Sequence, residues 1–316
     1  MVARQEEIET KRCMASNQPR RLTFIFTTKS WFQNRQFEAT PMVKEVEIIS
    51  VGNELLMGKT LNTNAQWLAK RTTSLGLYVM RITVIGDEVE EISRTIQEAY
   101  SRNLAFIITT GGLGPTFDDK TLEGIAKALN SKLTVNEEAL KMVEDKYAEY
   151  AEETGRKKLE LTPPRTKMAK LPAGAKPLHN PAGTAPGVVM RKGDVTVFVL
   201  PGVPCEMEAI FENSLLPVLK AAAGSQTFFE TSLYVAGVME SEMAPLIDQV
   251  MHDNPHIYVK SHPMGAEKKP SLELHLSTTS KDVKEAKKRV GKVLVQLVEM
   301  VKEKGGKTRL ANPEKP

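Results

Sequence analysis

Cysteine is scarce in this chain, which has two among 316 residues. Cys13 and Cys205 stand far apart, and neither belongs to a motif of closely spaced cysteines or histidines. This excludes a disulfide framework and a structural zinc site, and it fits the reducing environment of the cytoplasm. The sequence also lacks an apolar run long enough to span a membrane, so a membrane partner is not expected.

The chain also lacks a strong excess of either positive or negative charge. The formal net charge is +4 at pH 7, and acidic and basic residues are interspersed along the chain. This balance neither requires nor excludes nucleic acid, which is not the expected partner. Hydrophobic residues make up 41% of the chain, which is enough for a substantial core. The length predicts one large domain or two ordinary ones.

The chain divides into four segments by pattern. Residues 1–42 mix charges without sustained periodicity, and we expect a disordered extension there, with Met42 as a candidate start. Residues 43–221 alternate short apolar runs with amphipathic segments, which predicts an α/β domain with a doubly wound parallel sheet. Residues 222–306 predict a compact α+β module with an antiparallel sheet, and residues 307–316 a polar tail.

A glycine-rich turn between a strand and a helix is the most informative stretch. Residues 109–121 have the sequence TTGGLGPTFDDKT, after the apolar run LAFII and before a predicted helix over residues 122–129. Gly111, Gly112 and Gly114 allow positive φ and close approach of a ligand to the backbone. The helix start would offer free N–H groups and a positive dipole end, which favour a phosphate.

Two aspartates, Asp118 and Asp119, lie beside this expected phosphate. Carboxylates repel a phosphate unless a cation lies between them, and hard divalent cations prefer carboxylate oxygens. The motif therefore predicts a phosphate or pyrophosphate site bridged by Mg²⁺, Mn²⁺ or Co²⁺. A helix cap and a simple turn are the alternative, but these need only one aspartate and one glycine. The P-loop signature is absent, and a Rossmann fingerprint would need glycine where Phe117 stands.

Acidic residues also follow two other predicted strands. Glu54 and Asp87 lie just beyond the strands over residues 46–51 and 78–85. Sites in such sheets form at strand carboxyl ends, so these acids predict a hydrolase or nucleotidyl-transfer site together with Asp118 and Asp119. As single residues they could equally be helix caps or solvated loop charges. Further candidate ligand-binding residues are Gly52, Asn62, Asn64, Thr110, Thr121, Asn180, Gly183, Thr184, Pro201, Gly202 and Glu206.

Each of these further candidates has a structural alternative. The two asparagines could bond a ribose or phosphate, or satisfy turn backbone. The threonines could donate to phosphate oxygens, although Thr121 could also be an ordinary β-branched residue of the helix. The loop over residues 180–187 could wrap a ligand or serve as a rigid connector, and Glu206 could be an acid favoured by a helix dipole. Cys205 and the histidines of the second module are expected to be ordinary packing or surface residues.

Together these motifs resemble the MoaB/Mog molybdopterin-binding fold and, more closely, the N-terminal part of the competence-damage-inducible (CinA) family. The resemblance covers residues 43–221. It rests on the stretches ISVGNELLMG (49–58), NTN (62–64), IGD (85–87), TTGGLGPTFDD (109–119), NPAGTAPG (180–187) and PGVPCEM (201–207). The second module looks like the KH-type domain that follows in CinA proteins, although the Gly-x-x-Gly loop of RNA-binding KH domains is not evident.

The resemblance implies a three-layer α/β/α fold and a divalent-metal pyrophosphatase acting on ADP-ribose-like dinucleotides. By this resemblance Gly111, Gly112 and Gly114 would hold phosphate, Asp87, Asp118 and Asp119 would handle metal and water, and Glu54 and Asn64 would line the pocket. The family tends to oligomerise, so a homo-oligomer is the implied state. The chain ends before the nicotinamide-mononucleotide deamidase domain of many CinA proteins, so deamidation is not expected.

Two alternative functions stay open. One is molybdopterin binding or adenylyl transfer, as in Mog relatives, with a pterin nucleotide as the ligand. The other is a non-catalytic nucleotide- or RNA-binding protein that uses the KH-like module. Ligand binding without hydrolysis would favour the second alternative.

Overall fold

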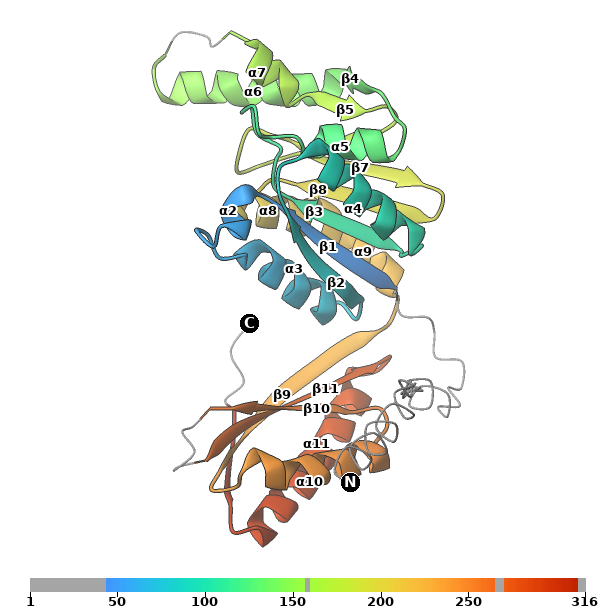
Figure 1. Ribbon diagram of the computed structural model, residues 1–316, viewed down its shortest axis with the longest axis vertical. Coiled ribbons are helices and arrows are strands. Elements are labelled where there is room, and N and C mark those ends of the chain that lie inside the picture. The colour runs from blue at the N-terminus through green and yellow to red at the C-terminus, as the bar shows by residue number, and fades with distance from the viewer. Residues whose placement is uncertain (1–43, 157–159, 265–269, 312–316) are drawn as a thin grey trace, which may run out of the picture. The chain divides into compact units, whose positions relative to one another are not determined.

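A computed structural model describes residues 44–156, 160–264 and 270–311. These residues form a six-stranded sheet, a four-stranded sheet and a two-stranded ribbon (Figure 1). Within the described residues, no helix is long and apolar enough to cross a membrane. The extension predicted over residues 1–42 lies outside the described part of the chain.

The first module carries the six-stranded sheet and the ribbon. Its elements in chain order are β1 (Glu45–Val51), α2 (Asn53–Leu56), α3 (Thr63–Ser74), β2 (Tyr78–Ile85), α4 (Val89–Ser101), β3 (Phe106–Thr110), α5 (Thr121–Ala128), β4 (Leu133–Val135), α6 (Glu137–Glu153), α7 (Pro163–Lys167), β5 (Lys170–Pro172), β6 (Lys176–Leu178), β7 (Gly187–Lys192), β8 (Val195–Leu200), α8 (Pro204–Ile210), the π-helix η1 (Phe211–Leu215) and α9 (Leu216–Ala223).

The six-stranded sheet is mixed, with the order β2-β1-β3-β8-β7-β6. Strands β2, β1, β3 and β8 are parallel, as the alternation of strands and helices predicts. The sequence also predicts a hairpin around Gly193 and Asp194, and it joins β7 to β8. Strand β6 pairs beyond β7, so this edge of the sheet is antiparallel. The carboxyl ends of the four parallel strands meet at one edge of the sheet, where α/β proteins place their sites.

Helices cover both faces of this sheet, which confirms the three-layer α/β/α arrangement (Figure 1). On one face, Ile92 of α4 and Ile125 of α5 pack with Ile107 of β3. On the other face, Leu68 of α3 and Phe211 of η1 pack beneath the same strand. All five side chains are fully buried. Because side chains alternate along a strand buried on both faces, its sequence is one continuous apolar run.

The second module is the antiparallel α+β unit that the sequence predicts. It consists of β9 (Thr227–Ala236), α10 (Glu240–Asp253), β10 (Tyr258–Pro263), β11 (Ser271–Ser280), α11 (Val283–Glu303) and β12 (Lys307–Leu310). The strand order is β10-β11-β9-β12, and each neighbouring pair is antiparallel. Leu233, Leu274, Val293 and Leu297 belong to its separate hydrophobic core.

Two sequence predictions are wrong. The polar tail contains β12, because pairing with β9 through the backbone needs no apolar pattern. The sequence also predicts a single helix that follows Glu206 and runs through Leu219, and η1 interrupts it. Pro217 lacks an N–H group and its ring crowds the carbonyl of Asn213, and a π-turn accommodates both effects.

Candidate functional site

A pocket of about 700 Å³ opens at the carboxyl ends of the parallel strands. Loops after β1, β2, β3 and β8 contribute to it, as the sequence predicts. The candidates that line it are Gly52, Glu54, Asp87, Gly111, Gly112, Gly114, Asp118, Asp119, Thr184, Pro201, Gly202 and Glu206. Asn62, Asn64 and Thr110 line an adjoining recess of about 90 Å³. Thr121, Asn180 and Gly183 are not among the described lining residues of either.

The glycines after β3 are required by the backbone itself. Gly111 has φ 105°, and a Cβ atom there would lie 2.1 Å from the carbonyl oxygen of Val51. Gly112 has φ 66°, and its Cβ would lie 2.3 Å from Oγ1 of Thr121. Any side chain would therefore push this loop away from β1 and α5. The loop stays close to both elements and leaves bare backbone on the pocket wall.

Thr121 supports this loop. Its side chain is fully buried, and its Oγ1 donates to the carbonyl oxygen of Gly111 at 2.8 Å. Its hydroxyl proton is therefore donated within the protein, and the donation to phosphate stays a prediction. Among the described residues, the first turn of α5 does not line the pocket. The backbone that faces the pocket belongs to the loop glycines, and not to the helix start that the sequence predicts.

Two carboxylates converge on one hydroxyl group at the rim of the pocket. Oγ1 of Thr116 lies 2.5 Å from Oδ1 of Asp118 and 2.5 Å from Oδ2 of Asp119. The backbone N–H of Thr116 also donates to Asp119 Oδ2 at 2.8 Å. The bond from Thr116, with smaller contributions from Lys167 and Lys120, lowers the pKa of Asp118. Both aspartates lie together as predicted, whereas Thr116 was missed.

Asp87 faces the same pocket from the loop after β2. Its Oδ2 accepts a hydrogen bond from the backbone N–H of Asn53 at 2.8 Å. Burial raises the pKa of Asp87, and the negative charges of Glu54, Asp118 and Asp119 raise it further, against the opposing effect of the Asn53 bond. The other three predicted acids are therefore close enough to Asp87 to raise its pKa.

Replacing Glu54 with glutamine should lower the pKa of Asp87, because a neighbouring negative charge disappears. The pKa should remain above its ordinary value because burial is unchanged. Carboxyl-carbon NMR across an acid titration measures this shift. Glu88→Gln, at an exposed acid beside Asp87, is the matched control and should have the smaller effect. An unchanged or raised pKa in Glu54→Gln contradicts this account of the acid cluster.

The donor set fits a hydrated divalent cation completed by the ligand. Within the described residues, no three histidine, cysteine or acidic side chains are grouped to hold a metal ion. Asp118 and Asp119 supply carboxylate oxygens at one point of the rim. Mg²⁺ commonly takes one or two carboxylates and fills its remaining positions with water and substrate phosphates. A ligand phosphate would thus complete the coordination.

Asn64 offers a buried acceptor in the adjoining recess. Its Nδ2 donates to Thr110 Oγ1 at 3.1 Å and to the carbonyl oxygen of Gly202 at 2.8 Å. Its Oδ1 is buried and has no partner among the described residues. A ligand hydroxyl or amine could satisfy this atom, and leaving it unpaired costs about 1–3 kcal/mol. Thr110 donates its own proton to the carbonyl oxygen of Pro201, so it is not free to donate to phosphate.

Asn180 organises the loop over residues 180–187. The side chain is 3% exposed, and its Nδ2 donates to the carbonyl oxygen of Ala185 and to Oε2 of Glu206. Its Oδ1 accepts from the backbone N–H groups of Ala182 and Gly183. A Cβ atom on Gly183 would lie 2.1 Å from the carboxyl carbon of Glu206. Asn180 and Gly183 therefore fix the shape of this loop, and their direct contact with a ligand stays a prediction.

Three comparisons place the chain among known proteins. Residues 47–221 match a family model described as "Probable molybdopterin binding domain". A protein of Pyrobaculum arsenaticum is 49% identical over 260 residues, covering 82% of this chain and 95% of its own. A protein of Sulfurisphaera tokodaii is 46% identical over 261 residues, which cover 82% of this chain and 96% of that protein. The crystal structure of CinA from Thermoplasma acidophilum, titled as of unknown function, is 40% identical with a TM-score of 0.50, covering 55% of this chain and 99% of its own.

The fold and site define a three-layer α/β protein with an acidic, glycine-lined pocket at the ends of its parallel strands. The chain belongs to the molybdopterin-binding domain family, through residues 47–221. Over 55% of its length the chain is also similar to CinA of Thermoplasma acidophilum, as the sequence motifs indicate. The second module lies outside the matched domain, and its likeness to KH domains stays a prediction.

Proposed function

We propose that the pocket binds a pterin nucleotide through its phosphoanhydride, together with a divalent cation, and that the protein acts in adenylyl transfer. The observation that carries this proposal is the meeting of Asp118 and Asp119 with the bare glycine backbone in one pocket of a molybdopterin-binding family domain. The pocket volume of about 700 Å³ is within the usual range for nucleotide-sized ligands.

Each described part of the pocket has a role in this reaction. Gly112 and Gly114 let the anhydride approach the backbone, and Asn64 lines the adjoining recess. Asp118 and Asp119 hold the cation, which when bound neutralises phosphate charge as a Lewis acid. Asp87, with its raised pKa, accepts a proton from the attacking group.

Hydrolysis of an ADP-ribose-like compound is the second candidate. In this reaction water would attack the anhydride of ADP-ribose and release AMP and ribose 5-phosphate. In adenylyl transfer a pterin phosphate would instead attack the α-phosphate of ATP and release pyrophosphate. The observation that favours it is Asp87, a carboxylate in the pocket that can act as a general base toward water. The ADP-ribose pyrophosphatase activity implied by the sequence resemblance thus remains a proposal, as does the choice among Mg²⁺, Mn²⁺ and Co²⁺.

Two assays separate these candidates. Release of pyrophosphate from ATP that depends on added molybdopterin supports adenylyl transfer, whereas AMP formed from ADP-ribose without an acceptor supports hydrolysis. Each is run with Mg²⁺, Mn²⁺, Co²⁺ and EDTA. Binding of neither ATP nor ADP-ribose under any of these conditions overturns the proposal as a whole. Binding of both without turnover would support the non-catalytic alternative.

A further inference from the structure

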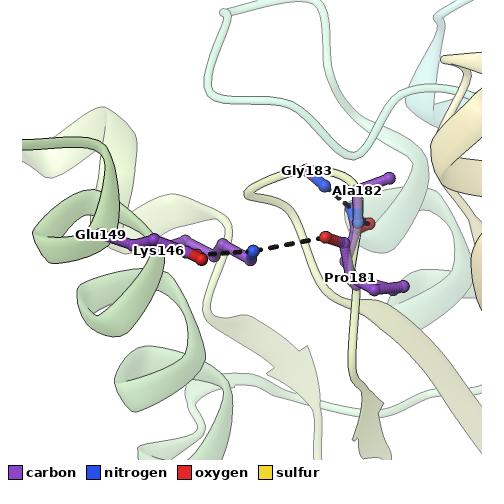
Figure 2. A network of polar contacts seen from close by, with 6 residues as sticks. Lys146, Glu149, Pro181, Ala182 and Gly183 are labelled. Carbon is purple, nitrogen blue, oxygen red and sulfur yellow. Dashed lines mark hydrogen bonds and ion pairs between the residues drawn. The ribbon is translucent and has the colours of Figure 1, made fainter. Parts of the chain in front are cut away.

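Tyr147 of α6 and Met168 at the end of α7 form one wall of the pocket, and both helices are hydrogen-bonded to pocket loops. Nζ of Lys146 donates to Glu149 at 2.7 Å and to the carbonyl oxygen of Pro181 at 3.3 Å (Figure 2). Nζ of Lys167 donates to the carbonyl oxygen of Thr116 at 2.5 Å. The first bond reaches the loop over residues 180–187, and the second reaches the loop that carries the two aspartates. The wall is therefore positioned relative to both loops.

Tyr147 follows Lys146 on this wall and faces the pocket. Among the described lining residues it is the only aromatic one, and the buried Met168 lines the pocket with it. The guanidinium carbon of Arg165 lies 4.0 Å from the centroid of the Tyr147 ring. Arg165 is itself held by a bond from Nη1 to the carbonyl oxygen of Glu160 at 2.6 Å. A cation stacked on a half-buried ring fixes the ring's orientation.

The pocket thus has two chemically different regions. The glycines and the carboxylates of Asp118 and Asp119 suit the phosphates and their cation. Tyr147 and Met168 offer an apolar aromatic surface, which suits neither phosphate nor cation. In a pterin or adenine nucleotide a planar heterocycle with π-faces is joined through a linker to a charged anhydride, so the two ends of the ligand match the two regions.

We propose that Tyr147, with Arg165 behind it, holds the planar heterocycle of the ligand and makes the pocket selective for ring-bearing anhydrides. This inference rests on the proposed function, because it assumes that a phosphoanhydride binds beside the aspartates. A purely structural role is the competing explanation, since Tyr147 also packs against the core of the first module. A ligand without a ring distinguishes the two explanations.

The test compares ADP with inorganic pyrophosphate, both in Mg²⁺, by calorimetry on the full chain. Tyr147→Leu should weaken ADP binding about tenfold, the upper end for an aromatic contact, and leave pyrophosphate binding unchanged within about twofold. Tyr147→Phe should keep parental affinity for ADP. Arg165→Met, which leaves the ring in place, should weaken ADP binding selectively by about threefold.

Tyr150→Leu is the matched control. Tyr150 lies on the same helix, also has an arginine over its ring, and is 44% exposed without lining the pocket. It should change neither affinity. Equal weakening of ADP and pyrophosphate by Tyr147→Leu assigns Tyr147 to structure and overturns the inference, and so does no change in either. If the parent chain binds neither compound, the proposed function fails first, which is a distinct result.

Discussion

Replacing Asp118 and Asp119 together with asparagine should reduce metal-dependent turnover by roughly a hundredfold or more, about 3 kcal/mol of barrier, while the chain stays folded. Asparagine keeps the shape of aspartate but removes the negative charge that attracts the cation. Its side-chain oxygen can still accept the hydrogen bond that Thr116 N–H donates to Asp119. The loss should therefore come from chemistry and not from unfolding.

The same double variant should bind nucleotide better than the parent when metal is absent, because two repelling charges are gone. Turnover with and without Mg²⁺, and nucleotide affinity in EDTA, are the measurements. Asp145→Asn, at an exposed position of α6 outside the pocket, is the control and should match the parent. A double variant with the parental rate and the parental metal requirement would show that the aspartates only cap and shape the loop.

Arg102→Leu should reduce the free energy of unfolding by about 3–5 kcal/mol, because it leaves a buried carboxylate without a partner. Glu47 of β1 is fully buried, and Arg102 at the end of α4 contacts it with two hydrogen bonds of 2.8 and 2.9 Å. Removing the guanidinium leaves that charge in the protein interior without compensation. Urea denaturation of the parent and the variant gives the difference directly.

Two further variants sharpen this stability prediction. Arg94→Leu removes an arginine of the same helix whose partner, Glu91, is a surface acid at 3.3 Å, so it should cost less than about 1 kcal/mol. The double variant Arg102→Leu with Glu47→Leu should be more stable than Arg102→Leu alone, because the stranded charge is removed. A loss in the free energy of unfolding that is as small in Arg102→Leu as in Arg94→Leu would contradict the account of Glu47 as a buried, charged partner of Arg102.

The sheet of the first module was predictable because its central strands are buried on both faces. Ile107 and Ile108 lie within a continuous apolar run, and helices with one apolar face flank it. β12 escaped prediction because its pairing with β9 depends on backbone groups, and its sequence KTRL carries no apolar pattern. The π-helix could not be predicted, because one proline in an apolar helix does not determine how the backbone around it adjusts.

The sequence predicted which loops form the site, but not which hydrogen bonds their side chains make. Glycines and acids at strand ends indicated Gly111, Asp87 and Asp118 because sheet topology brings those ends together. Asn180 has the residue type of a ligand-binding group, yet its bonds are taken by its own loop and Glu206. The sequence did not mark Tyr147 as a site residue, because a tyrosine on a charged helix resembles any surface aromatic residue.

The central claim is that Asp118 and Asp119 hold a cation jointly with the phosphates of the ligand. Mn²⁺-enhanced water-proton relaxation tests it, because the signal from a ternary complex differs from those of free Mn²⁺ and Mn²⁺–ADP. We expect weak Mn²⁺ binding by the protein alone and much tighter binding when ADP is added, with ADP affinity raised by the same factor. The double asparagine variant should lose this coupling. Mn²⁺ and ADP binding independently of each other, or coupling that survives in the double variant, would contradict the account.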